Sequence, residues 1–137
     1  MLLEELRRLA ERLEGYGVRL VVLFGSAARG DYTDESDVDV LVVADHLPSD
    51  PREAYEVVKR VVGGRVQPTC FTTSSFLRKL RGESTFIMEV LEDGKIAYAD
   101  AEFLEEVLAV YREVRARWVR RGRTWERVPH AAGAPAT

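Results

Sequence analysis

The chain has 137 residues, of which 46% are hydrophobic and 31% are charged, values that are ordinary for one globular domain with a buried core. Its net charge of −3 excludes a general electrostatic attraction to nucleic acid, which is therefore not expected as the main partner. The single cysteine, Cys70, excludes an internal disulfide. The sequence shows neither the features of a signal peptide nor an apolar run that could span a bilayer, so we expect a cytoplasmic protein with no membrane partner.

Helical and strand patterns alternate along the chain, separated by glycine and proline. The predicted strands cover residues 18–24, 37–44, 66–72 and 96–98, and the predicted helices cover residues 2–13, 51–62, 74–80, 85–91 and 101–119. Pro68 places the third strand at an edge or a bulge. This order predicts an α/β or α+β fold with a small mixed sheet flanked by helices. We expect one domain over residues 1–127 and a disordered tail over residues 128–137.

A Gly-Ser turn leaves the first predicted strand, whose residues 20–24 are apolar without interruption. Gly25 can adopt backbone angles that are closed to other residues, and it lets a ligand approach the main chain. We predict Ser26 at the N-cap of a short helical turn, whose free N–H groups favour an anion such as phosphate. Arg29 would add positive charge beside it. Gly25, Ser26 and Arg29 are therefore the candidate phosphate-binding residues.

Two aspartates open the second predicted strand. Because residues i and i+2 of a strand point to the same face, Asp37 and Asp39 are expected to project side by side while Val38 and Val40 face the core. Adjacent carboxylates repel each other unless a cation lies between them. Mg²⁺ commonly takes one or two protein carboxylates and completes its shell with water and substrate phosphates, so this pair predicts a site for Mg²⁺ or Mn²⁺.

The sequence Gly25-Ser26, ten further residues and then Asp37-Val38-Asp39 resembles the signature of the DNA polymerase β-type nucleotidyltransferase superfamily, and in particular its minimal stand-alone members. The resemblance implies a nucleotidyltransferase-like fold that binds an NTP with Mg²⁺, transfers a nucleoside monophosphate to a protein or small acceptor and releases pyrophosphate. It also implies a HEPN-type partner for which such a domain acts as antitoxin. The oligomeric state stays open, a homodimer included.

Gln67 departs from the family pattern, because active members carry a third carboxylate where this residue appears in the predicted third strand. Glutamine can bind a cation only weakly and cannot act as a general base. One reading is that another acid, Glu35 or Asp31, replaces it. The other is that the protein is a weak enzyme, or a nucleotide-binding or antitoxin module that acts by binding a partner. We expect Gln67 beside the Asp37/Asp39 pair and include all three among the candidate catalytic residues.

The last predicted helix carries an apolar stripe that includes Phe103, Val107 and Val114, which we interpret as core. Six arginines, interleaved with two tryptophans, follow or overlap its end: Arg115, Arg117, Arg120, Arg121, Arg123 and Arg127. The simplest interpretation is a solvated helix end, and the alternative is a surface that stacks on bases or holds phosphates. Arginine outnumbers lysine by 17 to 3 and asparagine is absent, which indicates either a thermophilic source or a GC-rich genome.

Overall fold

The computed structural model describes residues 2–31, 33 and 36–128. Its helices are α1 (Leu2–Arg12), α2 (Ser26–Arg29), α3 (Pro51–Val62), α4 (Thr73–Arg81), α5 (Thr85–Asp93) and α6 (Ala101–Arg115), with a 3₁₀ turn, η1, at Glu14–Tyr16. Its strands are β1 (Val18–Phe24), β2 (Val38–Ala44), β3 (Val66–Thr72), β4 (Lys95–Ala99), β5 (Trp118–Arg121) and β6 (Thr124–Arg127). Within this part of the chain, no helix has the length and apolar character needed to cross a membrane.

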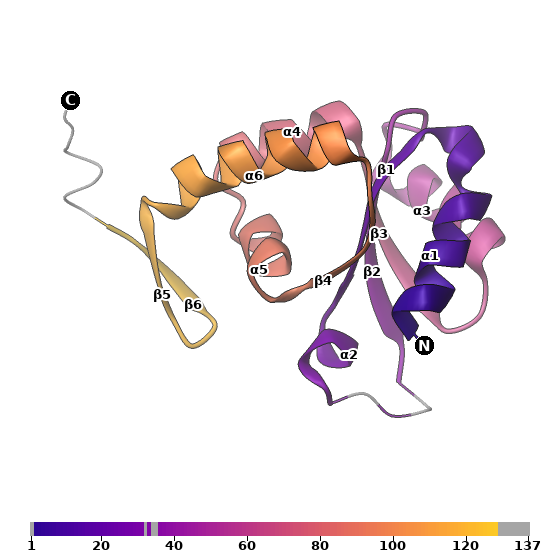
Figure 1. The fold of residues 1–137 in the computed structure, drawn as a ribbon, viewed down its shortest axis with the longest axis horizontal. Helices are drawn as coiled ribbons and strands as arrows, with labels where there is room; N and C mark the ends of the chain where they lie inside the picture. The colour runs from indigo at the N-terminus through magenta and orange to yellow at the C-terminus, as the bar shows by residue number, and fades with distance from the viewer. Residues whose placement is uncertain (1, 32, 34–35, 129–137) are drawn as a thin grey trace.

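Four strands form one mixed sheet in the order β3-β2-β1-β4 (Figure 1). β1 runs antiparallel to both of its neighbours, β2 and β4, whereas β2 and β3 are parallel and are joined through α3. The predicted mixed sheet is therefore confirmed. Pro68 lies in the edge strand β3, where its missing N–H removes no bond to a further strand.

Two hydrophobic cores cover the two faces of this sheet (Figure 1). Helices α1 and α3 pack on one face, where Val40 and Val58 are buried. Helices α4, α5 and α6 pack on the other, where Leu41 and Phe76 are buried. Neighbouring residues of β2 thus point into different cores, as the alternation of side chains along a strand requires.

Local sequence signals fix several of these elements at the predicted residues. Helix α3 begins and ends as expected, because the Asp50 carboxylate accepts a hydrogen bond from Arg52 N at 3.1 Å and Pro51 occupies the first helical position. Helices α5 and α6 are capped in the same way by Ser84 and Asp100. Helix α4 begins at Thr73 after a Thr72 cap, one residue before its predicted start. The apolar stripe of α6 faces the core, with Phe103, Val107 and Val114 buried, as predicted.

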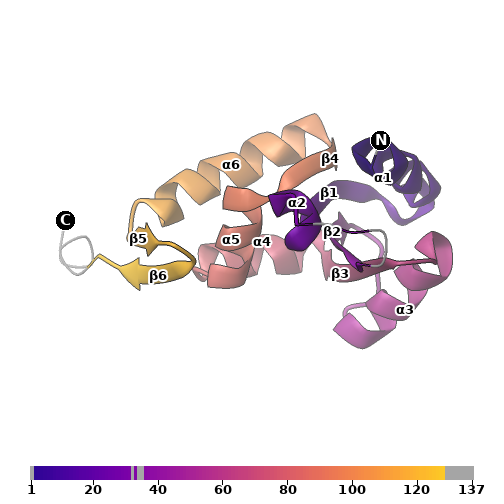
Figure 2. The same ribbon diagram turned by 90° about the horizontal axis from the view of Figure 1, so that it is seen from below.

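The C-terminal prediction was wrong in one respect. Helix α6 ends at Arg115 rather than continuing to residue 119, and the chain then forms the β5–β6 hairpin. Figures 1 and 2 place this hairpin beyond the end of α6, on the side of α5. The hairpin turns at Gly122, whose φ of +62° suits a two-residue turn. Of the tail predicted to be disordered, residues 129–137 lie outside the described residues.

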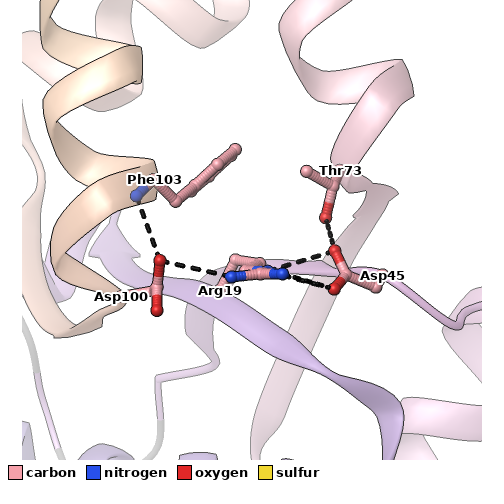
Figure 3. A network of polar contacts seen from close by, with 5 residues as sticks. All are labelled: Arg19, Asp45, Thr73, Asp100 and Phe103. Carbon is pink, nitrogen blue, oxygen red and sulfur yellow. Dashed lines mark hydrogen bonds and ion pairs between the residues drawn. The ribbon is translucent and has the colours of Figure 1, made fainter.

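A polar network ties the sheet to the helices at one end (Figure 3). The Arg19 guanidinium donates to both carboxylate oxygens of Asp45 at 2.8–3.2 Å and lies 3.3 Å from Asp100 Oδ2. Thr73 Oγ1 donates to Asp45 Oδ1 at 2.5 Å. These bonds hold the pKa of the Asp45 carboxyl below its usual value. The network involves the start of β1 and the residues after β2 and β4, so it lies at the end of the sheet opposite to Gly25.

Candidate nucleotide site

The phosphate turn and the aspartates meet at the end of β1 and the start of β2. Phe24 and Asp39 are paired across these antiparallel strands, so Gly25 follows directly beside Asp39. Gly25 has φ +76° and ψ −152°, a region of backbone space that is essentially restricted to glycine. A Cβ atom at this position would lie 2.5 Å from Asp39 Oδ2. Glycine is therefore required at position 25 for two reasons: other residues do not adopt these backbone angles, and a side chain would collide with the Asp39 carboxylate.

Helix α2 is a single turn that begins at Ser26, and its N-cap is Gly25 rather than the predicted Ser26. The Ala28 and Arg29 N–H groups both donate to the Gly25 carbonyl at 3.1 Å. The N–H groups that precede them in this turn, those of Ser26 and Ala27, are the ones that a first helical turn leaves without an intrahelical acceptor. The N-cap therefore lies one residue earlier than predicted, and the N–H groups of Ser26 and Ala27 still follow the residue that packs against Asp39.

The two aspartates differ in exposure. Asp37 is exposed immediately before β2 begins, whereas Asp39 is partly buried within it. Burial, together with the charge of Asp37, raises the pKa of the Asp39 carboxyl, and nearby Arg29 opposes this shift. On the other face, Val38 and Val40 are each only 2% exposed, as predicted. A carboxylate that carries this like-charge penalty is suited to a divalent cation placed against it.

The donor set fits a hard cation that keeps most of its own ligands. Within residues 2–31, 33 and 36–128, no group of three or more His, Cys, Asp or Glu side chains is placed to hold a metal ion. Asp37 and Asp39 are the carboxylates that we consider as ligands for a cation at this site. This matches Mg²⁺, which is commonly bound through one or two carboxylates, water and substrate phosphates.

Gln67 is paired with Asp39 in the parallel register of β2 and β3. Its neighbours in β3 alternate between the two cores, so Gln67 leaves the sheet on the same face as Asp39. Its Oε1 atom accepts a hydrogen bond from the Tyr55 hydroxyl at 3.0 Å. The neighbouring-strand position that we expected is thus observed, and the catalytic role stays a prediction.

The two acids considered as replacements for Gln67 gain no support. Asp31 has a side chain that is 71% exposed and lies 3.7 Å from Arg29 Nε. Glu35 lies outside the described residues. Asp31 is thus a surface residue paired with Arg29.

A cleft of about 190 Å³ opens beside the turn, between α2, α5 and the β5–β6 hairpin. Gly25 and Arg29 line it from the motif, and Phe24 and Phe86 form an apolar wall with their ring centroids 5.5 Å apart. The remaining lining residues are Glu89, Val90, Asp93 and Arg123. Sequence reasoning missed the contribution of α5 and of the hairpin, because nothing local in these segments indicates that they fold back toward Gly25.

Comparisons with known proteins find relatives that match parts of this chain. A relative from Methanocaldococcus jannaschii is 61% identical over 28 residues, which are 20% of this chain and 28% of that protein. The protein adenylyltransferase MntA of Thermococcus cleftensis is 40% identical over 58 residues, 41% of this chain and 59% of that protein. In both cases the match spans less than two thirds of the relative.

The fold is shared with a solved structure, described as a toxin–antitoxin with AMP-PNP, at a TM-score of 0.50 and 21% identity. The similarity covers 82% of this chain and 90% of that chain. The nucleotidyltransferase domain family matches residues 3–115, which include the turn, both aspartates, Gln67 and nearly all of the two cores. The chain therefore belongs to the nucleotidyltransferase domain family.

Proposed function

We propose that this protein transfers a nucleoside monophosphate from an NTP, with ATP as the preferred donor, to a protein hydroxyl and releases pyrophosphate. The observation that carries the proposal is the contact between Gly25 and Asp39, which joins a phosphate-binding turn to a carboxylate pair. The family supports nucleotidyl transfer. The name of the Thermococcus relative supports an adenylyl group, as does the AMP-PNP in the structure of the same fold.

The proposed roles follow from the chemistry of each group. The N–H groups of Ser26 and Ala27, with the Ser26 hydroxyl, would donate to phosphate oxygens, and Arg29 would add a cation. Asp37 and Asp39 would hold Mg²⁺, which when bound supplies positive charge to neutralise the phosphates and orient them. The position of Asp39, which is partly buried and packed against Gly25, supports a single site for these groups.

In the reaction, the acceptor hydroxyl oxygen forms a bond to the α-phosphorus, and the bond from this phosphorus to the bridging oxygen of pyrophosphate breaks. The hydroxyl proton has to leave the acceptor. The Gln67 amide has no basic site to receive it, and its Oε1 already accepts from Tyr55. Gln67 therefore cannot supply the general base of this reaction, so we expect slow transfer.

A HEPN-type protein is the partner that we propose as acceptor, with this chain as its antitoxin. The toxin–antitoxin structure that shares the fold is the support for this part of the proposal. The alternative is an antitoxin that acts by binding alone, and the specific observation in its favour is Gln67 in register with Asp39. The two versions differ in whether loss of the carboxylate pair abolishes neutralisation of the toxin.

The test measures whether ³²P from radiolabelled ATP is incorporated into a co-purified HEPN-type protein. Label from [α-³²P]ATP, but not from [γ-³²P]ATP, should become acid-precipitable in the presence of Mg²⁺. Asp39→Asn should abolish this incorporation. Asp50→Asn is the matched control, because it makes the same chemical change at the α3 N-cap, where asparagine caps equally well.

Three outcomes separate the readings. Incorporation of the α-label that depends on Asp39 supports the enzyme. Incorporation of the γ-label would refute nucleotidyl transfer, because it reports transfer of a phosphoryl group. Tight complex formation without any labelling, unchanged by Asp39→Asn, would refute the enzyme and favour the binding module.

A further inference from the structure

The β5–β6 hairpin lies outside the segment matched by the family, yet it is fastened to the domain by its arginines. Glu83, in the turn between α4 and α5, accepts from Arg117 Nη1 at 3.2 Å and from Trp118 Nε1 at 3.0 Å. Arg127 Nη1, on the other strand, lies 3.2 Å from the same carboxylate. One acidic side chain thus holds both strands at the open end of the hairpin.

A second anchor lies closer to the tip. The Arg120 guanidinium donates to both oxygens of Asp93, at 2.7 and 2.6 Å, which is the two-bond geometry of a strong arginine–carboxylate pair. Arg120 and Arg115 also lie over the Trp125 ring, 5.3 and 4.9 Å from its centroid. Because Asp93 is the last residue of α5 and lines the cleft, this anchor fixes the hairpin against the nucleotide site.

Arg123 differs from the other arginines of this region. Arg115, Arg117, Arg120, Arg121 and Arg127 each have a carboxylate partner. Among the described residues no ion pair within 4.0 Å is formed by Arg123, which occupies the two-residue turn with Gly122. Arg123 is also the arginine of the hairpin that lines the cleft with Gly25 and Arg29.

The surroundings of Arg123 indicate what its guanidinium could bind. Asp93 lines the cleft and attracts Arg123 electrostatically, but its two oxygens are engaged by Arg120. Glu89 lines the cleft as well, and no ion pair joins it to Arg123 in the described part of the chain. Arg29 and Arg123 bring two guanidinium groups to a cleft that Glu89 and Asp93 also line and that opens onto the backbone of Gly25. Because Asp93 is already bound by Arg120, the Arg123 guanidinium is placed to bind an anion that enters the cleft.

We propose that Arg123 is a phosphate-binding residue, whose guanidinium binds the polyphosphate of the NTP beyond its α-phosphate, from the side of the cleft opposite to the Ser26 turn. This inference rests on the proposed function, because it assumes that the NTP binds in the cleft lined by Gly25, Arg29 and Arg123. It adds a second source of phosphate ligands, contributed by a hairpin that follows the segment shared with the family.

The test uses calorimetric titration of the full chain with three probes in the presence of Mg²⁺: AMP-PNP, inorganic tripolyphosphate and AMP. Arg123→Gln should weaken AMP-PNP and tripolyphosphate about 10- to 100-fold, as expected for loss of a charge-assisted hydrogen bond, and should leave AMP unchanged. Arg123→Lys should recover part of the loss. The matched control is Arg121→Gln, which removes a neighbouring arginine whose side chain is 70% exposed and paired with Glu126.

The outcomes distinguish this inference from the proposed function. If Arg123→Gln binds all three probes as tightly as Arg121→Gln does, the inference is overturned, even where the wild-type protein transfers label. If the losses appear but wild-type protein transfers no α-label, the phosphate role stands and the proposed reaction fails. If the wild-type protein binds neither AMP-PNP nor tripolyphosphate, both are overturned. Equal melting temperatures for the two variants would confirm that the hairpin remains folded.

Discussion

The substitution Gly25→Ala tests the central feature of the site, the close approach of the turn to Asp39. Alanine at φ +76° and ψ −152° should cost about 1–3 kcal/mol in backbone strain. Its Cβ would also lie 2.5 Å from Asp39 Oδ2, so the carboxylate must move away from the turn. We expect a fold that survives, because a loss of this size is smaller than the total stability of a typical domain. We expect nucleotide binding with Mg²⁺ to be lost.

Gly30→Ala is the control, because Gly30 ends the same helical turn at φ +88° with nothing within 4 Å of an added Cβ. Its strain should be about 1–2 kcal/mol, so both variants should melt roughly 3–10 °C below the wild type. Thermal unfolding measures this shift, and titration with AMP-PNP and Mg²⁺ measures binding. The reasoning is refuted if Gly25→Ala binds the nucleotide as tightly as Gly30→Ala.

Three further predictions concern other parts of the molecule. Gln67→Glu should raise both Mg²⁺ affinity and the rate of label transfer, since it adds a carboxylate in register with Asp39. Asp45→Asn should lower the free energy of unfolding at pH 7 by about 1–3 kcal/mol, because Asp45 accepts charge-assisted bonds from Arg19. The buried thiol of Cys70, whose pKa burial raises to about 12, should resist alkylation at pH 8 until the protein is unfolded.

The prediction for Asp45→Asn can also be tested through the pH dependence of stability. The pKa of Asp45 is lower in the folded protein than in the unfolded chain. Its contribution to the free energy of unfolding is therefore complete at pH values above the unfolded pKa, and it is lost as the pH falls through the folded pKa. Denaturant titrations of wild type and Asp45→Asn should therefore converge below about pH 4. A constant difference down to pH 3 would contradict this. Unchanged metal affinity in Gln67→Glu, or rapid alkylation of native Cys70, would contradict the other two predictions.

Much of the fold could be predicted because its signals are local. Helix α3 has a capping residue, a proline at its first position and a glycine after its end, and strand β3 has Pro68 to mark it as an edge. The alternation of valine and aspartate in β2 assigned both faces of that strand. Each of these features depends on residues within one element, which is the range over which sequence patterns are informative.

The parts that could not be predicted depend on contacts between distant residues. The prediction extended α6 to residue 119, yet contacts of Glu83, Asp93 and Trp125 hold the arginine-rich segment as a hairpin. Gly122, midway between the two tryptophans, was the one local indication of a turn. Likewise, the residues Gly25 and Ser26 led to the proposed phosphate-binding turn, whereas the opposite wall of the cleft required the positions of α5 and the hairpin.

The antiparallel pairing of β1 with β2 has a consequence for the order of folding. Phe24 pairs with Asp39 across a short stretch of chain, whereas Leu20 pairs with Ala99 only after most of the domain has been made. Short-range pairings close small loops at low entropic cost and form quickly, and long-range ones form slowly. The meeting of the turn with its carboxylate is thus a local event, and during synthesis on the ribosome it can precede the addition of β4 to the sheet.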